Sequence, residues 1–159
     1  MYMDTFILYL DTKESVQNKK AIFEILRLCI LKLTKELTIQ YTVVFSKEDF
    51  SEYGGIEKVF SEIKNYIPEC STVIIWDEAT KVYLDRQKIL GVNKVGLLRF
   101  LFLKKALQEK WQYSNKLLDI KTACKQANIE YEDTKIEEPN YIAERMLLLY
   151  RYLSQRIED

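Results

Sequence analysis

The stretch STVIIWDEAT, Ser71–Thr80, indicates which class of fold to expect. Its central residues run apolar without a break up to Trp76, a pattern typical of a strand that is buried on both faces of a sheet. Two carboxylates, Asp77 and Glu78, follow directly. We therefore predict a buried strand with acidic side chains at its carboxyl end, the edge at which open α/β sheets bind ligands.

Two further runs of this kind lie upstream, in Asp4–Asp11 and Thr38–Phe45. Between them, Glu14–Leu37 carries two apolar stripes at helical spacing, which predicts a helix packed on a sheet. A second helix is expected over Ile56–Tyr66. Alternating strands and helices favour right-handed crossovers and a parallel sheet. The predicted fold class is α/β: a small Rossmann-like three-layer fold with a short, mostly parallel sheet flanked by helices.

The second half of the chain is expected to be mainly helical. The whole chain therefore predicts a βαβαβ core over residues 1–88 and a helical C-terminal extension over 89–159, packed together as one compact domain. For Lys81–Leu84 a strand and a loop remain open. The other elements expected in this half are helices over Asn93–Trp111, Ser114–Ala127 and Pro139–Arg156, and a short strand over Asn128–Asp133.

Composition narrows the classes of function. The chain has 24 basic and 24 acidic residues, so it lacks the overall field that would draw it to nucleic acid or an anionic membrane. It contains no histidine, which excludes Ser-His and Cys-His nucleophile pairs and most zinc catalysis. Three widely spaced cysteines and a short N-terminal apolar run favour a cytoplasmic protein without a membrane segment.

The acidic strand end allows one metal-dependent interpretation. Asp11 is expected to end the first strand and Asp77 the third, and in the strand order 2-1-3 these ends are neighbours. With Glu78 they could hold Mg²⁺, and Lys13 could neutralise a phosphate, giving a site for phosphoryl transfer or nuclease chemistry. The run VIIWDE also has the form of a Walker B strand, but no P-loop follows the first strand, so an NTPase is rejected.

Two other segments are candidates for phosphate or nucleic-acid contacts. Gly54 and Gly55 precede a predicted helix and could let a phosphate approach the backbone, although a plain tight turn explains them too. Residues 90–128 hold eight basic and two acidic residues, and an acidic segment follows. Phosphate binding and base stacking are assigned here to a candidate set: Lys104, Lys105, Lys110, Trp111, Tyr113 and Lys116.

Aromatic residues make up 13% of the chain, and tyrosine is the commonest of them. Tyrosine and tryptophan are favoured at interfaces, where a ring is buried while its polar edge stays wet. We therefore predict association with another protein or a second copy. The residues assigned to this interface are Leu98, Phe102, Leu148, Tyr150 and Tyr152.

Three functions follow from the sequence. The leading prediction is a cytosolic protein-binding or regulatory domain without catalysis or cofactor, acting as an adaptor, a regulator or a toxin-neutralising partner. The alternative is a Mg²⁺-dependent phosphoryl-transfer enzyme or nuclease. The third is a nucleic-acid or nucleotide binder that uses the basic segment. Convergence of Asp11, Asp77 and Glu78 in one cleft is the observation that separates the second from the others.

Overall fold

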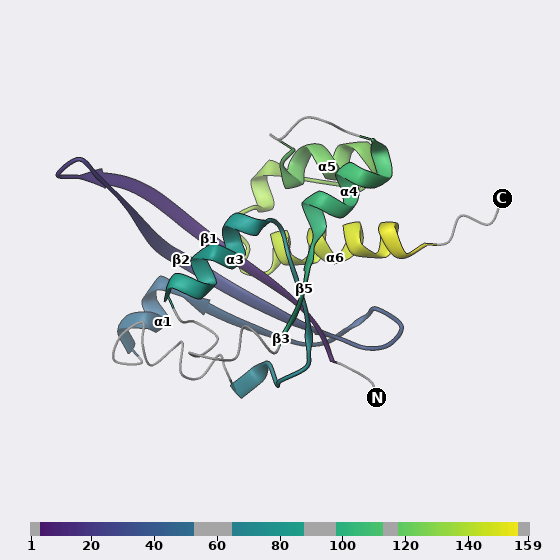
Figure 1. The fold of residues 1–159 in the computed structure, drawn as a ribbon, viewed down its shortest axis with the longest axis horizontal. Coiled ribbons are helices and arrows are strands. Elements are labelled where there is room, and N and C mark those ends of the chain that lie inside the picture. The colour runs from purple at the N-terminus through teal and green to yellow at the C-terminus, as the bar shows by residue number, and fades with distance from the viewer. Residues whose placement is uncertain (1–3, 53–64, 88–97, 113–117, 156–159) are drawn as a thin grey trace.

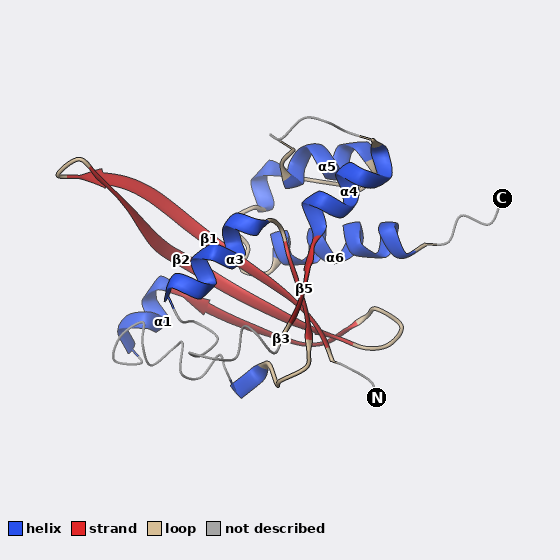
Figure 2. Cartoon of the chain, viewed as in Figure 1, coloured by secondary structure: helices blue, strands red, loops and turns tan. Residues whose placement is uncertain are grey.

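The computed structural model describes residues 4–52, 65–87, 98–112 and 118–155. They form a mixed α/β fold with one five-stranded sheet in the order β3-β2-β1-β4-β5 (Figure 2). The expectation of an α/β protein is thereby confirmed. The strands are β1 (Thr5–Gln17), β2 (Lys20–Leu33), β3 (Ile39–Ser46), β4 (Thr72–Ile75) and β5 (Arg99–Phe102).

The predicted helix over Glu14–Leu37 is wrong, because this segment forms the end of β1 and the whole of β2. The two strands make an antiparallel hairpin. Its two-residue turn, Asn18 and Lys19, has φ values of 51° and 63°, as a type I′ turn requires. Successive residues of β2 are buried on opposite faces of the sheet, so its apolar run is almost continuous. Such a run resembles a helix with two apolar stripes.

The sheet is mixed rather than mostly parallel. β2 pairs antiparallel with both β1 and β3, whereas β4 pairs parallel with β1 and with β5. The predicted helical crossover between the strands Asp4–Asp11 and Thr38–Phe45 is therefore wrong, because β2 lies between these strands in the sheet and pairs antiparallel with both. The expected neighbourhood of the first strand and the strand before Asp77 is confirmed, since Ile7 of β1 pairs with Ile74 of β4.

The core consists of two apolar clusters, one on each face of the sheet. Phe6 and Leu8 of β1 pack on one face together with Leu84 of the helix that follows β4. Ile7 of β1 and Ile74 of β4 pack on the other face, against the C-terminal helices. Because alternate residues of a strand point to opposite faces, the central strands supply both clusters.

The helices are assigned to the two faces by these clusters. α4, α5 and α6 contribute to the second cluster and are grouped on one side of the sheet (Figure 1). The helical segments that lie wholly within the described residues are α1 (Lys47–Glu52), α3 (Glu78–Gln87), α4 (Leu103–Trp111), α5 (Ile120–Gln126), α6 (Tyr141–Ser154) and a 3-10 turn, Asp133–Lys135. Among the described residues, none of the helices is both long and apolar enough to span a bilayer.

Several expectations for the second half need correction. The helix predicted over Asn93–Trp111 is wrong in part, because Arg99–Phe102 forms β5 and only the following residues are helical. Asn128–Asp133 forms no strand and leads into the 3-10 turn. Lys81–Leu84 is helical, within α3. The helix predicted over Ile56–Tyr66 lies almost wholly outside the described residues.

The β1–β2 hairpin extends well beyond the rest of the sheet (Figure 1). β4 pairs with β1 only over Thr5–Ile7, and β3 pairs with β2 only over Arg27–Leu33. Within the described part of the chain, the sheet pairing of residues 12–24 is confined to the β1–β2 hairpin, in which Thr12 lies opposite Ile25. We call residues 12–24 the arm.

Candidate functional site

A pocket of about 460 Å³ lies where β4 and β5 end and the helices after them begin. β4 leads into α3 through Asp77, and β5 leads directly into α4. These are the carboxyl ends of two adjacent parallel strands, the part of an open α/β sheet where ligands bind. The pocket is lined by Asp77, Glu78, Ala79, Phe102, Lys104, Lys105 and Gln108.

Asp77 stabilises the start of α3. Its Oδ1 accepts hydrogen bonds from the backbone N–H of Thr80 at 3.0 Å and from the Thr80 hydroxyl at 2.8 Å. This is the geometry of an N-cap, which satisfies one of the unpaired N–H groups at a helix start. Glu78, the first residue of the helix, is exposed. Carboxylates at this end of a helix are also favoured by its dipole.

Lys104 and Lys105 occupy the first turn of α4, where positive charge opposes the helix dipole. No acidic residue lies in that turn, and Phe102, at the N-cap position, provides no side-chain hydrogen bond. Within the described residues, neither lysine has an ion-pair partner. The backbone N–H of Lys104 donates to the Trp76 carbonyl at 2.9 Å, which fixes the start of α4 beside the end of β4. Two lysines without a described ion pair therefore line a pocket that also carries two carboxylates.

This pocket joins residues that the sequence had assigned to two separate hypotheses. Asp77 and Glu78 were candidate metal ligands, and Lys104 and Lys105 were candidate nucleic-acid contacts. The structure places all four around one pocket because β5 is a strand adjacent to β4. The aromatic run RFLF, Arg99–Phe102, was the signal for that strand, since aromatic residues favour sheets.

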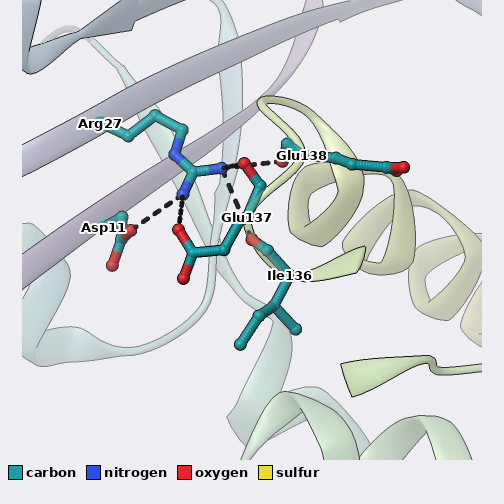
Figure 3. A network of polar contacts seen from close by, with 5 residues as sticks. All are labelled: Asp11, Arg27, Ile136, Glu137 and Glu138. Atoms are coloured by element: carbon teal, nitrogen blue, oxygen red, sulfur yellow. Dashed lines mark hydrogen bonds and ion pairs between the residues drawn. The ribbon is translucent and has the colours of Figure 1, made fainter. Parts of the chain in front are cut away.

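Asp11 does not end a strand, and it does not line this pocket. β1 continues to Gln17, and Asp11 lies within it at a shift in register. Its Oδ2 lies 3.3 Å from Nη2 of Arg27 on the neighbouring strand (Figure 3). Lys13, the predicted phosphate contact, is exposed on the arm. Asp11 and Lys13 are therefore not among the residues that line the pocket with Asp77 and Glu78.

Arg27 connects the sheet to the segment that leads into α6. Its Nη1 donates to the carbonyls of Glu138 at 2.7 Å and Glu137 at 3.1 Å, with a longer contact to the Ile136 carbonyl at 3.5 Å (Figure 3). The Arg27 side chain is only 12% exposed. Burial raises the pKa of Asp11, and the Arg27 guanidinium opposes this rise. Through these contacts, the Asp11–Arg27 pair holds the segment before α6 against the sheet.

Among the residues that the structure describes, no group of three or more Asp, Glu, Cys or His side chains is placed to hold a metal ion. Asp77 and Glu78 remain close to each other at the pocket. A divalent cation that they held would need its other ligands from water and from a phosphate, the arrangement that Mg²⁺ commonly adopts.

The rest of the predicted nucleic-acid set is distributed elsewhere. Lys110 and Trp111 lie at the opposite end of α4 from the pocket and contact α6. Trp111 Nε1 donates to the Tyr152 hydroxyl at 2.9 Å, and Lys110 Nζ lies 5.2 Å from the centre of the same ring. Tyr113 and Lys116 lie outside the described residues, as do Gly54 and Gly55.

The residues assigned to a protein interface lie mostly within or against the core. Leu98 is 9% exposed and belongs to the first cluster. Phe102, Tyr150 and Tyr152 are partly buried and pack against the two clusters. Leu148 is half-buried on α6. Packing within the chain therefore accounts for much of the aromatic content on which the interface prediction depended.

No protein-family model and no curated protein matches the chain.

Proposed function

We propose that the chain binds a phosphate-bearing small molecule of the nucleotide class in the pocket at the ends of β4 and β5. The observation that carries this proposal is the pair Lys104 and Lys105, which line the pocket without a described acidic partner. An anion there would gain from both charges and from the start of α4. The pocket volume of about 460 Å³ falls within the range of small-molecule sites.

The residues that line the pocket would contact different parts of such a ligand. Lys104 and Lys105 neutralise phosphate oxygens, and Phe102 supplies an apolar wall. Asp77 and Glu78 would carry Mg²⁺ bound to the same phosphates, with water completing its coordination. Without the metal, the two carboxylates repel the ligand, so Mg²⁺ should strengthen binding. This combines the Mg²⁺ and nucleotide hypotheses of the sequence in one site and assigns Asp11 no part in it.

Calorimetric titration with ATP, with and without Mg²⁺, tests the proposal. Replacing Lys104 or Lys105 by Gln should weaken binding about tenfold, which corresponds to roughly 1.4 kcal/mol. The matched control is Lys125→Gln, an exposed lysine in the last turn of α5, which should leave affinity within about twofold. Adenosine, which lacks phosphate, should bind far more weakly. Equal affinity of wild type and both pocket variants would overturn the proposal.

A second pair of variants tests the metal separately. Asp77→Asn keeps an N-cap oxygen for Thr80, because asparagine caps helices as well as aspartate does. Asp77→Asn and Glu78→Gln should each reduce the gain in ATP affinity that Mg²⁺ produces. Each should leave binding of metal-free ATP equal or slightly tighter. An unchanged Mg²⁺ effect in both variants would exclude Asp77 and Glu78 as the metal's ligands.

The protein-binding, regulatory role without catalysis stays a prediction from the sequence, as do homodimerisation and a cytoplasmic location. Sedimentation analysis over a range of concentrations would test self-association, and Tyr150→Ala would test the assigned surface.

A further inference from the structure

The described side chains of the arm, residues 12–24, are mostly polar or cationic. Of its residues whose exposure is described, all but Ser15 are exposed. Val16, 73% exposed, is the only apolar side chain in that set. The turn and its flanks present Lys13, Lys19 and Lys20, none of which has an ion pair with a described residue.

The arm's own acidic residue near its base is already engaged. Glu24, opposite Lys13 in the hairpin, forms an ion pair with Lys47 at 2.6 Å. The hydrogen bond from Lys47 lowers the pKa of Glu24. Residues 12–23 hold three lysines and one glutamate, so the outer arm has a net positive charge. The neutral total charge of the chain conceals this local excess.

The shape of the arm fits one kind of polyanion. A two-stranded antiparallel ribbon can enter the major groove of B-form DNA, which is about 12 Å wide and about 8.5 Å deep. The five steps from Thr12 to Gln17 extend about 17 Å at about 3.4 Å per residue, long enough to cross the depth of the groove. An isolated two-stranded hairpin is marginal in water, so docking would also stabilise the arm.

We propose that the arm binds double-stranded DNA, inserting into the major groove while Lys13, Lys19 and Lys20 contact phosphates. The side chains of Thr12, Gln17 and Asn18 are available to donate and accept hydrogen bonds in the groove. This interaction uses a surface separate from the β4–β5 pocket and does not depend on the function proposed for that pocket.

Fluorescence anisotropy with a labelled duplex of about 20 base pairs, measured between 50 and 200 mM salt, tests the proposal. Each phosphate contact contributes about 0.9 to the slope of log affinity against log salt concentration. The triple variant Lys13→Gln, Lys19→Gln, Lys20→Gln should therefore lower that slope by about 2.7 and weaken binding at 50 mM salt at least tenfold.

The charge-matched control replaces three lysines outside the arm, in α5 and the 3-10 turn, by Gln: Lys121, Lys125 and Lys135. It makes the same change in net charge and should retain DNA affinity within about threefold. Circular dichroism and the urea midpoint check that both variants fold; the substituted arm side chains are exposed.

Three results would overturn the proposal: no binding of the duplex by the wild type, equal binding by the arm variant, or an equal loss in the control. A wild-type dimer that the arm substitutions convert to monomer would assign the arm to a second copy of the chain instead. A variant with Lys104→Gln and Lys105→Gln should bind DNA like the wild type, which separates this test from that of the pocket.

Discussion

Replacing Arg27 by Met removes the polar contacts between the sheet and the segment before α6, while it keeps an unbranched apolar side chain. Hydrogen bonds from a charged donor contribute about 1.5–3 kcal/mol when each is taken singly, and Arg27 makes three within 3.3 Å, to the Glu138 and Glu137 carbonyls and to Asp11. Because all three share one guanidinium, their energies do not add. Loss of one partner of a buried ion pair costs about 3–5 kcal/mol. Since the Asp11 side chain is 30% exposed, we expect a smaller loss, about 2–4 kcal/mol.

The assay is urea denaturation followed by circular dichroism. With a slope of about 2 kcal/mol per molar urea, the midpoint should fall by about 1–2 M. The effect should also depend on pH. Because the pKa of Asp11 is raised in the folded chain, the folded state binds more protons than the unfolded state, and this group's contribution to stability falls as pH rises above its ordinary pKa. Without Arg27 the pKa rises further, so the penalty should be larger at pH 7 than at pH 4.

The double variant Arg27→Met, Asp11→Asn is the control. It loses the same carbonyl contacts and leaves only the 88%-exposed carboxylate of Glu137 without its ion pair, so most of the pH-dependent part of the penalty should disappear. A loss of unfolding free energy below about 0.5 kcal/mol for Arg27→Met, the range of ordinary surface changes, would refute a stabilising role for these contacts. An equal loss at pH 4 and pH 7 would refute the electrostatic reasoning.

Three further outcomes are expected. Lys19→Gly should raise the melting temperature by a few degrees, because glycine adopts the positive φ of 63° without the steric cost of roughly 1–2 kcal/mol; no increase would show that the turn is not strained. A thiol reagent should modify Cys70 alone in the folded chain at pH 8 and all three cysteines in urea, since burial raises the pKa of Cys29 to about 12 and of Cys124 to about 11; rapid reaction of a second thiol would contradict this burial. Lys104→Gln should stabilise the ligand-free chain by about 0.3–1 kcal/mol in urea denaturation, because it removes a cation from the start of a helix; destabilisation would mean that this lysine contributes to the fold.

The sequence predicted the elements whose patterns are unambiguous. β4 is a short apolar run that ends in turn-forming residues, and α6 has a clear apolar stripe over Tyr141–Ser154, so both were placed within a few residues. β2 was mistaken for a helix because Leu28 and Ile30 face one cluster while Cys29 and Leu31 face the other. A strand buried on both faces has no period of two from which to recognise it.

The turn that would have corrected this error gives a faint signal. Asn18 and Lys19 adopt positive φ without a glycine, whereas Asn-Gly is the usual marker of a two-residue hairpin. The candidate site was affected in the same way. Its four charged residues were all identified, but grouping them required β5, which the helical spacing of the surrounding residues concealed.

The place of β1 in the sheet has a consequence for synthesis of the chain. β1 lies at the centre of the sheet but is made first, and Ile7 must wait for Ile74, 67 residues later, to complete its second ladder. A hairpin forms in about 1–10 μs, whereas translation at about 5–20 residues per second takes several seconds to reach β4. During that interval the nascent chain carries a formed hairpin with an apolar, unpaired edge. Factors that shield nascent chains should therefore have their largest effect on yield before β4 emerges.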